Sequence, residues 1–521
     1  MDIQRADQQR LSRGSPSGRW IPLGLFSLSL GFGLVAIGGS HFEGLYGQDS
    51  FAYYGYALGP LRASLLHGQA PPPFFWPLGY PLLAALASLL VGNRGPQLVS
   101  LLAAALVPLF TFALADEVLA GENSLAPRRR RIATLSGVLA ALCGLLLQAG
   151  TVVMSDASAL AWATLAAWAL VRYGRGGRVC WLALAAFSLA WSILTRWAYG
   201  LLVLPFAAYG LATLLRPSDH PQPNLLRRLV GHTGAAVLAG LIVLGPELVL
   251  AFLPSAGGDG PAHVGDLQVV GWWLGNALKR NFVTVDGHLS YPLPTGIFYA
   301  TAIARPSYFT PLLAPAILAG FWSLWRRRAW RLAVLLVGWP AIVYLFLAGI
   351  AWQSLRFTLQ MLPPLAMLIA LGLDEVHDGT RGRTRTLAML WIVAGLALMF
   401  GGAMRNISIF TGEMNANVAT AGWVAGQVPA DAQVLTFNLT STLDHYTALD
   451  VQDIFFQSPE TLPQTLASHR PVYLFVDVAS LEQQWVDRSP EITYRWLRDN
   501  PGLTTLGHWE SYTLFRVGDG R

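Results

Sequence analysis

Four charged residues stand at the ends of long apolar runs in this sequence, and their side chains are of types that take part in catalysis. Asp49 and Asp156 carry carboxylates, which can take a proton from a hydroxyl group. Arg196 and Arg356 carry guanidinium groups, which can bind two phosphate oxygens and offset charge that develops on a leaving group. Each has a structural alternative, because aspartate caps helices and interfacial arginine extends toward lipid head groups.

A second set of residues suits binding rather than proton transfer. Lys279, the only lysine, precedes Arg280, and the pair either attracts an anionic lipid head group or is simply solvated. Glu247 lies inside an apolar run, where an ionisable side chain is costly and indicates a sugar contact or a metal ligand. Aromatic residues suited to a substrate cavity, and equally to a membrane interface, are Tyr53, Tyr54, Trp76 and Tyr80.

No metal site is assigned from the sequence. His41, Glu43 and His67 fall between the first two apolar runs without the spacing of a metal motif. Cys143 and Cys180 both lie within apolar runs, which excludes a disulfide framework and a cysteine metal site. No cofactor is therefore certain, and a divalent metal at the carboxylates stays open.

The composition predicts the kind of protein that positions these residues. Of 521 residues, 54% are hydrophobic and 12% are charged, against roughly a quarter charged in a soluble domain. Runs long enough to cross a bilayer occupy residues 20–404, preceded by a polar tail at 1–19 and followed by a soluble composition over 405–521. The first run lacks a cleavage site and is interpreted as a retained span rather than a signal peptide.

Charge decides the topology. Eleven spans are predicted, at residues 20–38, 97–118, 132–152, 157–173, 179–195, 197–215, 229–252, 309–325, 330–349, 357–373 and 386–404. The apolar segment 78–92 is shorter than a spanning helix, and we expect it to lie in the membrane interface. The inside loops then hold 21 Lys and Arg residues and the outside loops seven. This asymmetry predicts a cytoplasmic N-terminus and an extracytoplasmic C-terminal domain.

Because the basic residues sit mostly in these short loops, the net charge of +6 indicates topology rather than a nucleic-acid partner. Two long outer loops are expected, at residues 39–96 and 253–308. Within the first, the stretches 51–67 and 78–92 are amphipathic, and they either lie on the membrane plane or pack as ordinary loop helices.

The first outer loop carries a series of motifs. An acidic residue follows the first span, then comes an aromatic-rich helix and the segment WPLGYPLL. Further on come TVVMSDASAL, SILTRWAYGL and LRFTLQMLPPL, in that order. Together these resemble the protein mannosyltransferase and aminoarabinose transferase branch of the GT-C glycosyltransferases. Two departures stand out: Asp49 precedes Ser50, so the adjacent acidic pair of protein mannosyltransferases is absent, and the seventh span ends GPELVLAFLP.

The resemblance implies a polytopic α-helical membrane enzyme of the GT-C fold, with about eleven transmembrane helices, in a bacterial-type plasma membrane. Its donor would be a polyprenyl-phosphate-linked sugar, and its reaction a hexosyl or pentosyl transfer with inversion on the outer face. Asp49 would be the base, and Asp156 would orient the acceptor or bind a metal. Binding of the donor phosphate would fall to Arg196, Arg356, Lys279 and Arg280.

The acceptor is left open by the sequence: a lipid, a glycan, a protein or a small molecule. The missing acidic neighbour of Asp49 weakens the case for a protein acceptor. A rival function is a transporter or flippase of lipid-linked sugars, and a third is a non-catalytic scaffold, which the presence of Asp49 and Asp156 disfavours.

The last part of the chain has a different pattern. From residue 415, helix-like pieces alternate with short apolar strands, which predicts a small extracytoplasmic α/β domain with a largely parallel sheet. No glycine-rich phosphate loop accompanies it, so a nucleotide site is not expected. Its role would be to recognise the acceptor or a partner, or to cover the active site.

Overall fold

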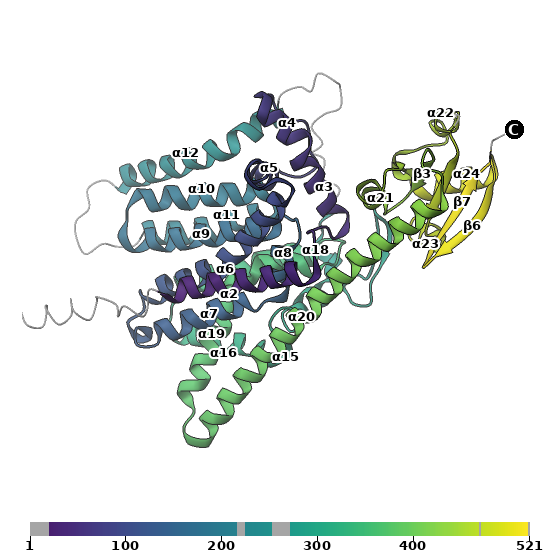
Figure 1. Cartoon of the computed structure of the whole chain (residues 1–521). Coiled ribbons are helices and arrows are strands. Elements are labelled where there is room, and N and C mark those ends of the chain that lie inside the picture. The colour runs from purple at the N-terminus through teal and green to yellow at the C-terminus, as the bar shows by residue number, and fades with distance from the viewer. Residues whose placement is uncertain (1–19, 216–224, 253–270, 468–469, 519–521) are drawn as a thin grey trace, which may run out of the picture.

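The computed structural model describes residues 20–215, 225–252, 271–467 and 470–518. A bundle of long helices forms one part of the molecule, and a single long helix connects it to a small domain that contains a sheet (Figure 1). The expected tail at 1–19 and the first part of the second outer loop, 253–270, lie outside the described residues.

The bundle is built from helices of very different length. In chain order they are α2 (Trp20–Ser40), α6 (Gly95–Leu119), α7 (Arg129–Ala141), α8 (Gly144–Thr151), α9 (Asp156–Gly176), α10 (Val179–Thr195), α11 (Val203–Leu214), α12 (Leu225–Phe252), α15 (Thr310–Leu313), α16 (Ala316–Arg326), α17 (Trp330–Leu336), α18 (Gly338–Gly349), α19 (Leu362–Gly379) and α20 (Gly382–Gln427). A short 3₁₀ turn, η3 (Asn123–Leu125), connects α6 to α7.

Six helices in the described residues are long and apolar enough to cross a membrane, or seven if the bent pair α7 and α8 is one span. The polytopic helical class expected from the sequence is confirmed, whereas the count of eleven stays a prediction. The difference has local causes. The helices α7 and α8 meet at 56°, and the expected span 309–325 is divided between α15 and α16 next to Pro315.

The bundle core depends on close helix contacts. At the crossing of α16 and α19, a Cβ atom on Gly320 would lie 2.0 Å from the Leu368 carbonyl oxygen, and one on Gly372 would lie 1.9 Å from that of Ala316. Only glycine fits at either position. Buried apolar residues fill most of α19 as it runs through the bundle.

Arginines from two basic loops meet acidic residues in the last part of α19. Arg131 Nε lies 2.5 Å from Asp374 Oδ1, and Arg327 Nη2 lies 2.6 Å from Glu375 Oε1, which also lies 3.2 Å from Arg128 Nη2. Because 12 residues of α19 precede Asp374, this cluster lies about 18 Å along the helix from its start. Loops that the charge pattern assigned to one side of the membrane therefore gather at one end of the bundle.

Shorter elements cover the opposite end. They are α3 (Gly47–Leu58), α4 (Pro60–His67), α5 (Gly79–Val91), η2 (Gly92–Arg94), η4 (Trp197–Leu202), η5 (Leu274–Leu278), β1 (Asn281–Thr284), β2 (Gly287–Ser290), α14 (Thr295–Ala302) and η6 (Leu355–Met361). The 13 residues of α5 reach about 20 Å, well short of a ~30 Å hydrocarbon core. It packs against α3, α6 and α10, so the first outer loop forms packed helices that still expose an apolar edge at Leu89 and Leu90.

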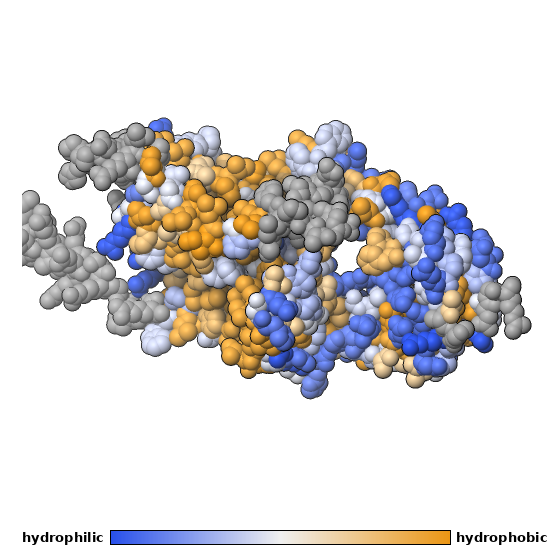
Figure 2. All heavy atoms as spheres, turned by 90° about the horizontal axis from the view of Figure 1, so that it is seen from above, coloured by the Kyte–Doolittle hydropathy of each residue, from blue (hydrophilic) through white to orange (hydrophobic). Residues whose placement is uncertain are grey.

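The helix α20 is continuous for 46 residues and passes through the expected domain boundary at 405 without a break. Beyond it lies the C-terminal domain, whose elements are β3 (Gln433–Thr436), α21 (Thr440–Tyr446), β4 (Asp450–Asp453), η7 (Ile454–Phe456), α22 (Leu462–Leu466), β5 (Val472–Val476), α23 (Val478–Gln483), α24 (Ser489–Asp499), β6 (Leu503–Trp509) and β7 (Tyr512–Val517). Figure 2 shows apolar residues over the bundle and hydrophilic residues over this domain.

The sheet has the strand order β4-β3-β5-β7-β6. Strand β3 pairs in parallel with β4 and β5, whereas β7 pairs antiparallel with β5 and β6. The expectation of a largely parallel sheet is therefore wrong for its last two strands. The expectation differs from the structure because the segment from Leu503 to Val517 folds as a hairpin instead of contributing one strand.

Candidate active site

A cavity of about 160 Å³ lies at the end of the bundle that faces the C-terminal domain. It is bounded by the first turn of α3, the segment before α5, the turn between α8 and α9, the junction of α10 with η4, and the start of η6. The residues that line it are Asp49, Tyr53, Trp76, Pro77, Met154, Asp156, Arg196, Trp197, Ala198 and Arg356. Six of these are residues that the sequence singled out.

Hydrogen bonds to backbone groups hold the first outer loop against the α8–α9 turn. The side-chain amide of Gln97 donates to the carbonyl oxygens of Phe42 and Thr151, at 3.1 and 3.0 Å. The Val153 N–H donates to the Gly44 carbonyl oxygen at 2.8 Å. These bonds hold the segment before Asp49 against the segment before Asp156, and so bring two acids that are distant in sequence to one cavity.

Asp49 pairs with Arg356 across the cavity, with 2.5 Å between Oδ2 and Nη2. The helix α3 begins at Gly47 rather than at Ser50, and no side chain caps it. It is instead the hydroxyl of Ser50 that accepts a bond from the Tyr46 N–H, at 2.7 Å. The capping alternative for Asp49 is therefore wrong. A carboxylate in the first turn of a helix is still favourable, because that end of the helix dipole is positive.

Asp156 is the first residue of α9 and pairs with Arg196, with 2.7 Å between Oδ1 and Nη1. No side chain caps this helix either, so capping does not explain Asp156. Its side chain is buried, and among the described residues its second oxygen, Oδ2, has no hydrogen-bond partner. Buried polar atoms without a partner are rare in proteins, and this one lies in the wall of a cavity.

Tyr53 and Trp76 form an aromatic wall of the cavity, stacked with their ring centroids 5.0 Å apart. The Tyr53 hydroxyl lies 3.1 Å from the Ser155 hydroxyl. Burial raises the pKa of Tyr53 well above its ordinary value, although the nearby Arg196 opposes this. The phenol therefore stays protonated at neutral pH and can donate a hydrogen bond, but it cannot serve as a base.

Tyr80 lies behind this wall and does not line the cavity. Its ring meets that of Tyr53 edge-on at 5.2 Å. Its buried hydroxyl donates to the Pro96 carbonyl oxygen at 2.9 Å and lies 2.9 Å from the Ser100 hydroxyl. The motif around Tyr80 therefore supports the wall by fixing α5 against α6.

Four other predicted residues lie elsewhere. Tyr54 turns toward the C-terminal domain, where its ring meets that of His445 at 5.6 Å. Lys279 and Arg280 are exposed after η5, and the Lys279 ammonium lies 4.9 Å from the centroid of the Trp273 ring. Glu247 is buried in α12, near Tyr56. The pKa of Tyr56 is raised to about 12, mainly because Tyr56 is buried and to a lesser extent because the Glu247 carboxylate is nearby.

In the parts of the chain that the structure describes, no three His, Cys, Asp or Glu side chains come together as a metal site would require. The two acids of the cavity each pair with an arginine instead. The structure therefore does not assign ligands to the divalent metal that the sequence left open.

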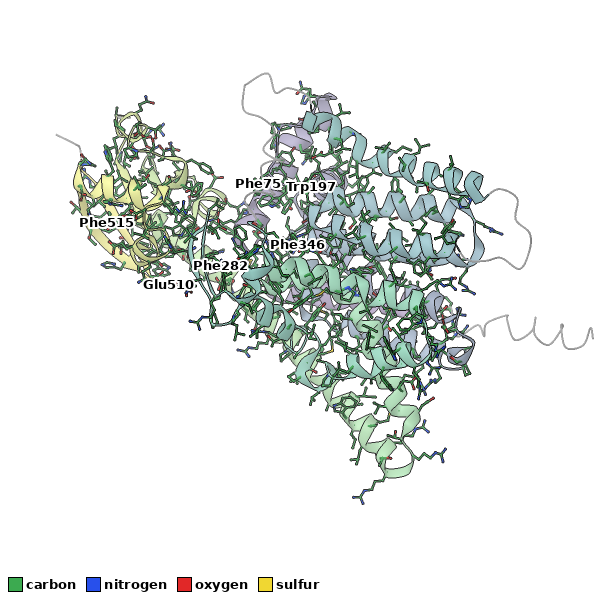
Figure 3. The ribbon with its side chains drawn as sticks, turned by 180° about the vertical axis from the view of Figure 1, so that it is seen from behind. Phe75, Trp197, Phe282, Phe346, Glu510 and Phe515 are labelled. Carbon is green, nitrogen blue, oxygen red and sulfur yellow. The ribbon has the colours of Figure 1, made fainter. Side chains whose placement is uncertain are left out.

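Sequence reasoning missed several lining residues, including Met154 and Trp197. Each lies within two positions of a predicted charged residue, and that adjacency was the available signal. Figure 3 labels Trp197 and Phe75, which both lie at the end of the bundle nearest to the C-terminal domain.

No protein-family profile and no curated protein sequence matches the chain. Solved structures do match it. ArnT from Cupriavidus metallidurans in the apo state has a TM-score of 0.61 at 13% identity, covering 97% of this chain and 99% of that one. ArnT bound to undecaprenyl phosphate has a TM-score of 0.57 at 12% identity, covering 95% of this chain and 98% of that one.

The archaeal oligosaccharyltransferase AglB from Archaeoglobus fulgidus, in complex with an inhibitory peptide and a dolichol-phosphate, also has a TM-score of 0.57 at 12% identity. That match covers 95% of this chain and 74% of AglB. The likeness extends over both the bundle and the C-terminal domain. The chain therefore has, over nearly its whole length, the GT-C fold that its sequence motifs predicted.

Proposed function

We propose that this protein transfers a sugar from a polyprenyl phosphate to an acceptor hydroxyl at the extracytoplasmic face of the membrane. The observation that carries the proposal is the cavity in which two carboxylates and two guanidinium groups meet. Guanidinium groups suit the donor phosphate, and a carboxylate suits the acceptor proton. The matched structures of ArnT and AglB contain undecaprenyl phosphate and dolichol-phosphate, which supports a donor of this class.

The chemistry is a single displacement at the anomeric carbon. The acceptor oxygen forms a bond to that carbon while the bond between the carbon and the phosphate oxygen breaks. The electron pair of the broken bond stays on the phosphate, and the acceptor proton passes to a carboxylate. Because the two bonds lie on opposite faces of the carbon, the configuration inverts.

Asp49 suits the role of base better than Asp156. The Asp49 side chain keeps 32% of its surface exposed, whereas that of Asp156 keeps 6%. An acceptor hydroxyl can therefore reach Asp49 more easily. Asp156, with its unpartnered oxygen in the cavity wall, suits a positioning contact to a sugar hydroxyl.

Arg356 and Arg196 suit the donor phosphate. Each guanidinium has five N–H donors, and its ion pair with a carboxylate uses only one nitrogen: Nη2 in Arg356 and Nη1 in Arg196. The carboxylates thus hold both groups in place while leaving donors for a ligand. Such preorganised donors stabilise charge on the departing phosphate without reorganising during the reaction.

The place of the cavity in the bundle supports the outer-face assignment. It lies at the end of the bundle from which α20 leads to the C-terminal domain, and the cluster of basic loops lies at the far end of α19. Basic loops are retained on the cytoplasmic side. The cavity would then open on the opposite side.

The proposal is tested with the full chain purified into lipid nanodiscs. Undecaprenyl phosphates carrying radiolabelled mannose, glucose, galactose or aminoarabinose are supplied together with an envelope extract as the source of acceptor. We expect one donor to lose its label to the extract or to water. Label that stays on intact lipid with every donor, while the lipid changes leaflet in proteoliposomes, would overturn the transferase in favour of a flippase.

A further inference from the structure

A second cavity, of about 460 Å³, lies between the C-terminal domain and the outer end of the bundle. Its lining includes the aromatic side chains of Phe437, Phe456 and Trp485 and the polar side chains of Gln48, Asp286 and Asp453. The chemistry proposed above uses none of them.

The cavity is formed at the carboxyl ends of the three parallel strands. Phe437 and Asn438 follow β3, and Phe455 and Phe456 follow β4. After β5, the short helix α23 leads to Gln484 and Trp485. Ligands of open α/β sheets characteristically bind outside this end of the strands, where the connecting loops diverge. The domain thus presents a binding edge of a familiar kind.

This edge is held facing the bundle by hydrogen bonds from the β1–β2 hairpin. The His288 N–H donates to the Gln484 carbonyl oxygen at 2.6 Å, and the Gln484 side-chain amide donates to the Asp286 carbonyl oxygen at 2.8 Å. The Asp286 carboxylate in turn accepts a bond from the Trp352 indole at 2.6 Å. In Figure 3, Phe282 of the hairpin lies between the bundle and the C-terminal domain.

The lining suits a sugar ring. Trp485 packs edge-on against Phe437 with ring centroids 4.7 Å apart, and Phe456 is 81% exposed. Trp485 is only 6% exposed, and among the described residues its indole N–H has no hydrogen-bond partner. Aromatic surface for the apolar face of a ring, with a few polar groups for its hydroxyls, is the usual make-up of a small-molecule site.

The charged side chains in the lining restrict the chemical class of the ligand further. The lining contains two carboxylates, Asp286 and Asp453, and no lysine, arginine or histidine. A phosphorylated or carboxylated group would meet like charge here without a compensating cation. A neutral, hydroxyl-rich group would meet acceptors for its hydroxyls.

The helix α3 lines both the first and the second cavity. Gln48 lines the second cavity and its neighbour Asp49 lines the first, both in the first turn of α3. We propose that the second cavity binds a neutral sugar unit of the acceptor and so directs a neighbouring hydroxyl of the same molecule toward Asp49. This inference rests on the proposed function and makes the acceptor a glycan.

The test measures glycoside binding to the full chain in nanodiscs, without any donor. The probes are the methyl glycosides of glucose, galactose, mannose and N-acetylglucosamine, and glucose 6-phosphate serves as the anionic counterpart. We expect at least one neutral glycoside to bind by saturation-transfer NMR and calorimetry, and glucose 6-phosphate not to bind. Phe456→Ala and Trp485→Phe should each weaken binding by about 2- to 12-fold, the usual effect of losing one aromatic contact or its polar handle.

Leu506→Ala is the matched control, because Leu506 is exposed on β6, at the opposite edge of the sheet from β4. It should bind the glycoside as the wild type does. Glycoside binding that neither cavity variant weakens, or equal binding of glucose 6-phosphate, would overturn the inference.

The two proposals fail in different ways. If the wild type releases sugar from a polyprenyl donor but the cavity variants bind glycosides normally, the acceptor site is overturned and the transferase stands. If the variants lose glycoside binding but no donor ever loses its sugar, the transferase and the acceptor role fail together, and only a sugar-binding cavity remains.

Discussion

The guanidinium groups of Arg196 and Arg356 lie against one aromatic ring, that of Phe357, with their central carbons 5.5 and 5.4 Å from its centroid. The two arginines come from different helix junctions, and each also pairs with its own carboxylate. Phe357 therefore serves as a shared platform that keeps two cations at one cavity despite their mutual repulsion. Its position next to Arg356 was the one feature that could have singled it out before the structure was known.

Replacing Arg356 should weaken donor use. We expect Arg356→Ala to lower donor turnover about 10²- to 10³-fold, as losing a preorganised donor to a developing oxyanion does. Arg356→Lys should restore it only in part, because an ammonium cannot make the planar two-bond contact. The measurement is kcat/KM for the polyprenyl donor. Arg62→Ala, on α4 and away from the cavity, is the control; wild-type kinetics in Arg356→Ala would show that this arginine only anchors the interface.

Replacing Asp49 by asparagine should abolish most transfer while the protein stays folded. Asn keeps the size of the side chain but cannot take the acceptor proton, so turnover should fall about 10²- to 10⁴-fold. The partly exposed pair with Arg356 contributes about 1 kcal/mol or less to stability, so the melting temperature should change little. Near-normal transfer by Asp49→Asn would exclude Asp49 as the base, and Asp156→Asn would be examined next.

Tyr53→Phe should leave the shape of the pH–rate profile unchanged between pH 6 and 9. Burial raises the pKa of this phenol above its ordinary value of 10.0, so it stays neutral throughout that range. The stability that the neutral phenol contributes is fully present below pH 10 and is lost as the pH rises above that value. Loss of the contact to Ser155 should cost about 0.5–1.5 kcal/mol, measured by thermal unfolding. A profile whose alkaline limb moves in Tyr53→Phe would show that the phenol titrates during catalysis.

The topology can be tested by cysteine labelling in intact cells. After Cys143 and Cys180 are replaced by alanine, a cysteine at the exposed position Gln69 should react with an impermeant thiol reagent. A cysteine at Ala126, exposed in the loop that ends in four consecutive arginines, should react only after the cells are permeabilised. Labelling at Ala126 in intact cells would invert the assignment and remove the cavity from the outer face.

The four charged residues of the cavity were accessible to sequence reasoning because of a general property of membrane bundles. Span ends on one side of the bilayer share a plane, so polar residues at those ends are drawn together even when far apart in sequence. Asp49 and Arg356, 307 positions apart, meet for this reason. Motif order and charge asymmetry were enough to place both on one face.

The aromatic residues were harder to place, because the rotation of a helix about its axis is not readable from a short segment. Tyr53 and Tyr54 are adjacent on α3, and successive helical side chains point about 100° apart. Only one of them can face the cavity: Tyr53 does, and Tyr54 meets His445 of the other domain. Which one would do so depended on the packing of α3 against α5.

The hairpin β6–β7 was missed for a related reason. Its turn includes Glu510, at a φ of 52°, a left-handed conformation that glycine or asparagine normally signals. Without that signal the segment looked like one strand. A domain boundary was expected at 405 because the composition changes there from apolar to polar. No proline interrupts the chain from Arg405 to Gln427, however, and the helix continues through that position.

Because α20 is continuous, its length fixes where the C-terminal domain lies relative to the bundle. Its 46 residues span about 69 Å, more than twice the ~30 Å hydrocarbon core. Each residue added between the bundle and the C-terminal domain would move that domain by about 1.5 Å along the helix axis and turn it by about 100°. The position of the domain along the helix axis and its orientation about that axis are therefore coupled. The length of this one helix sets both the distance of the sheet edge from the bilayer and the direction in which that edge faces. Related chains with longer or shorter helices would therefore direct the edge toward a different part of the membrane surface.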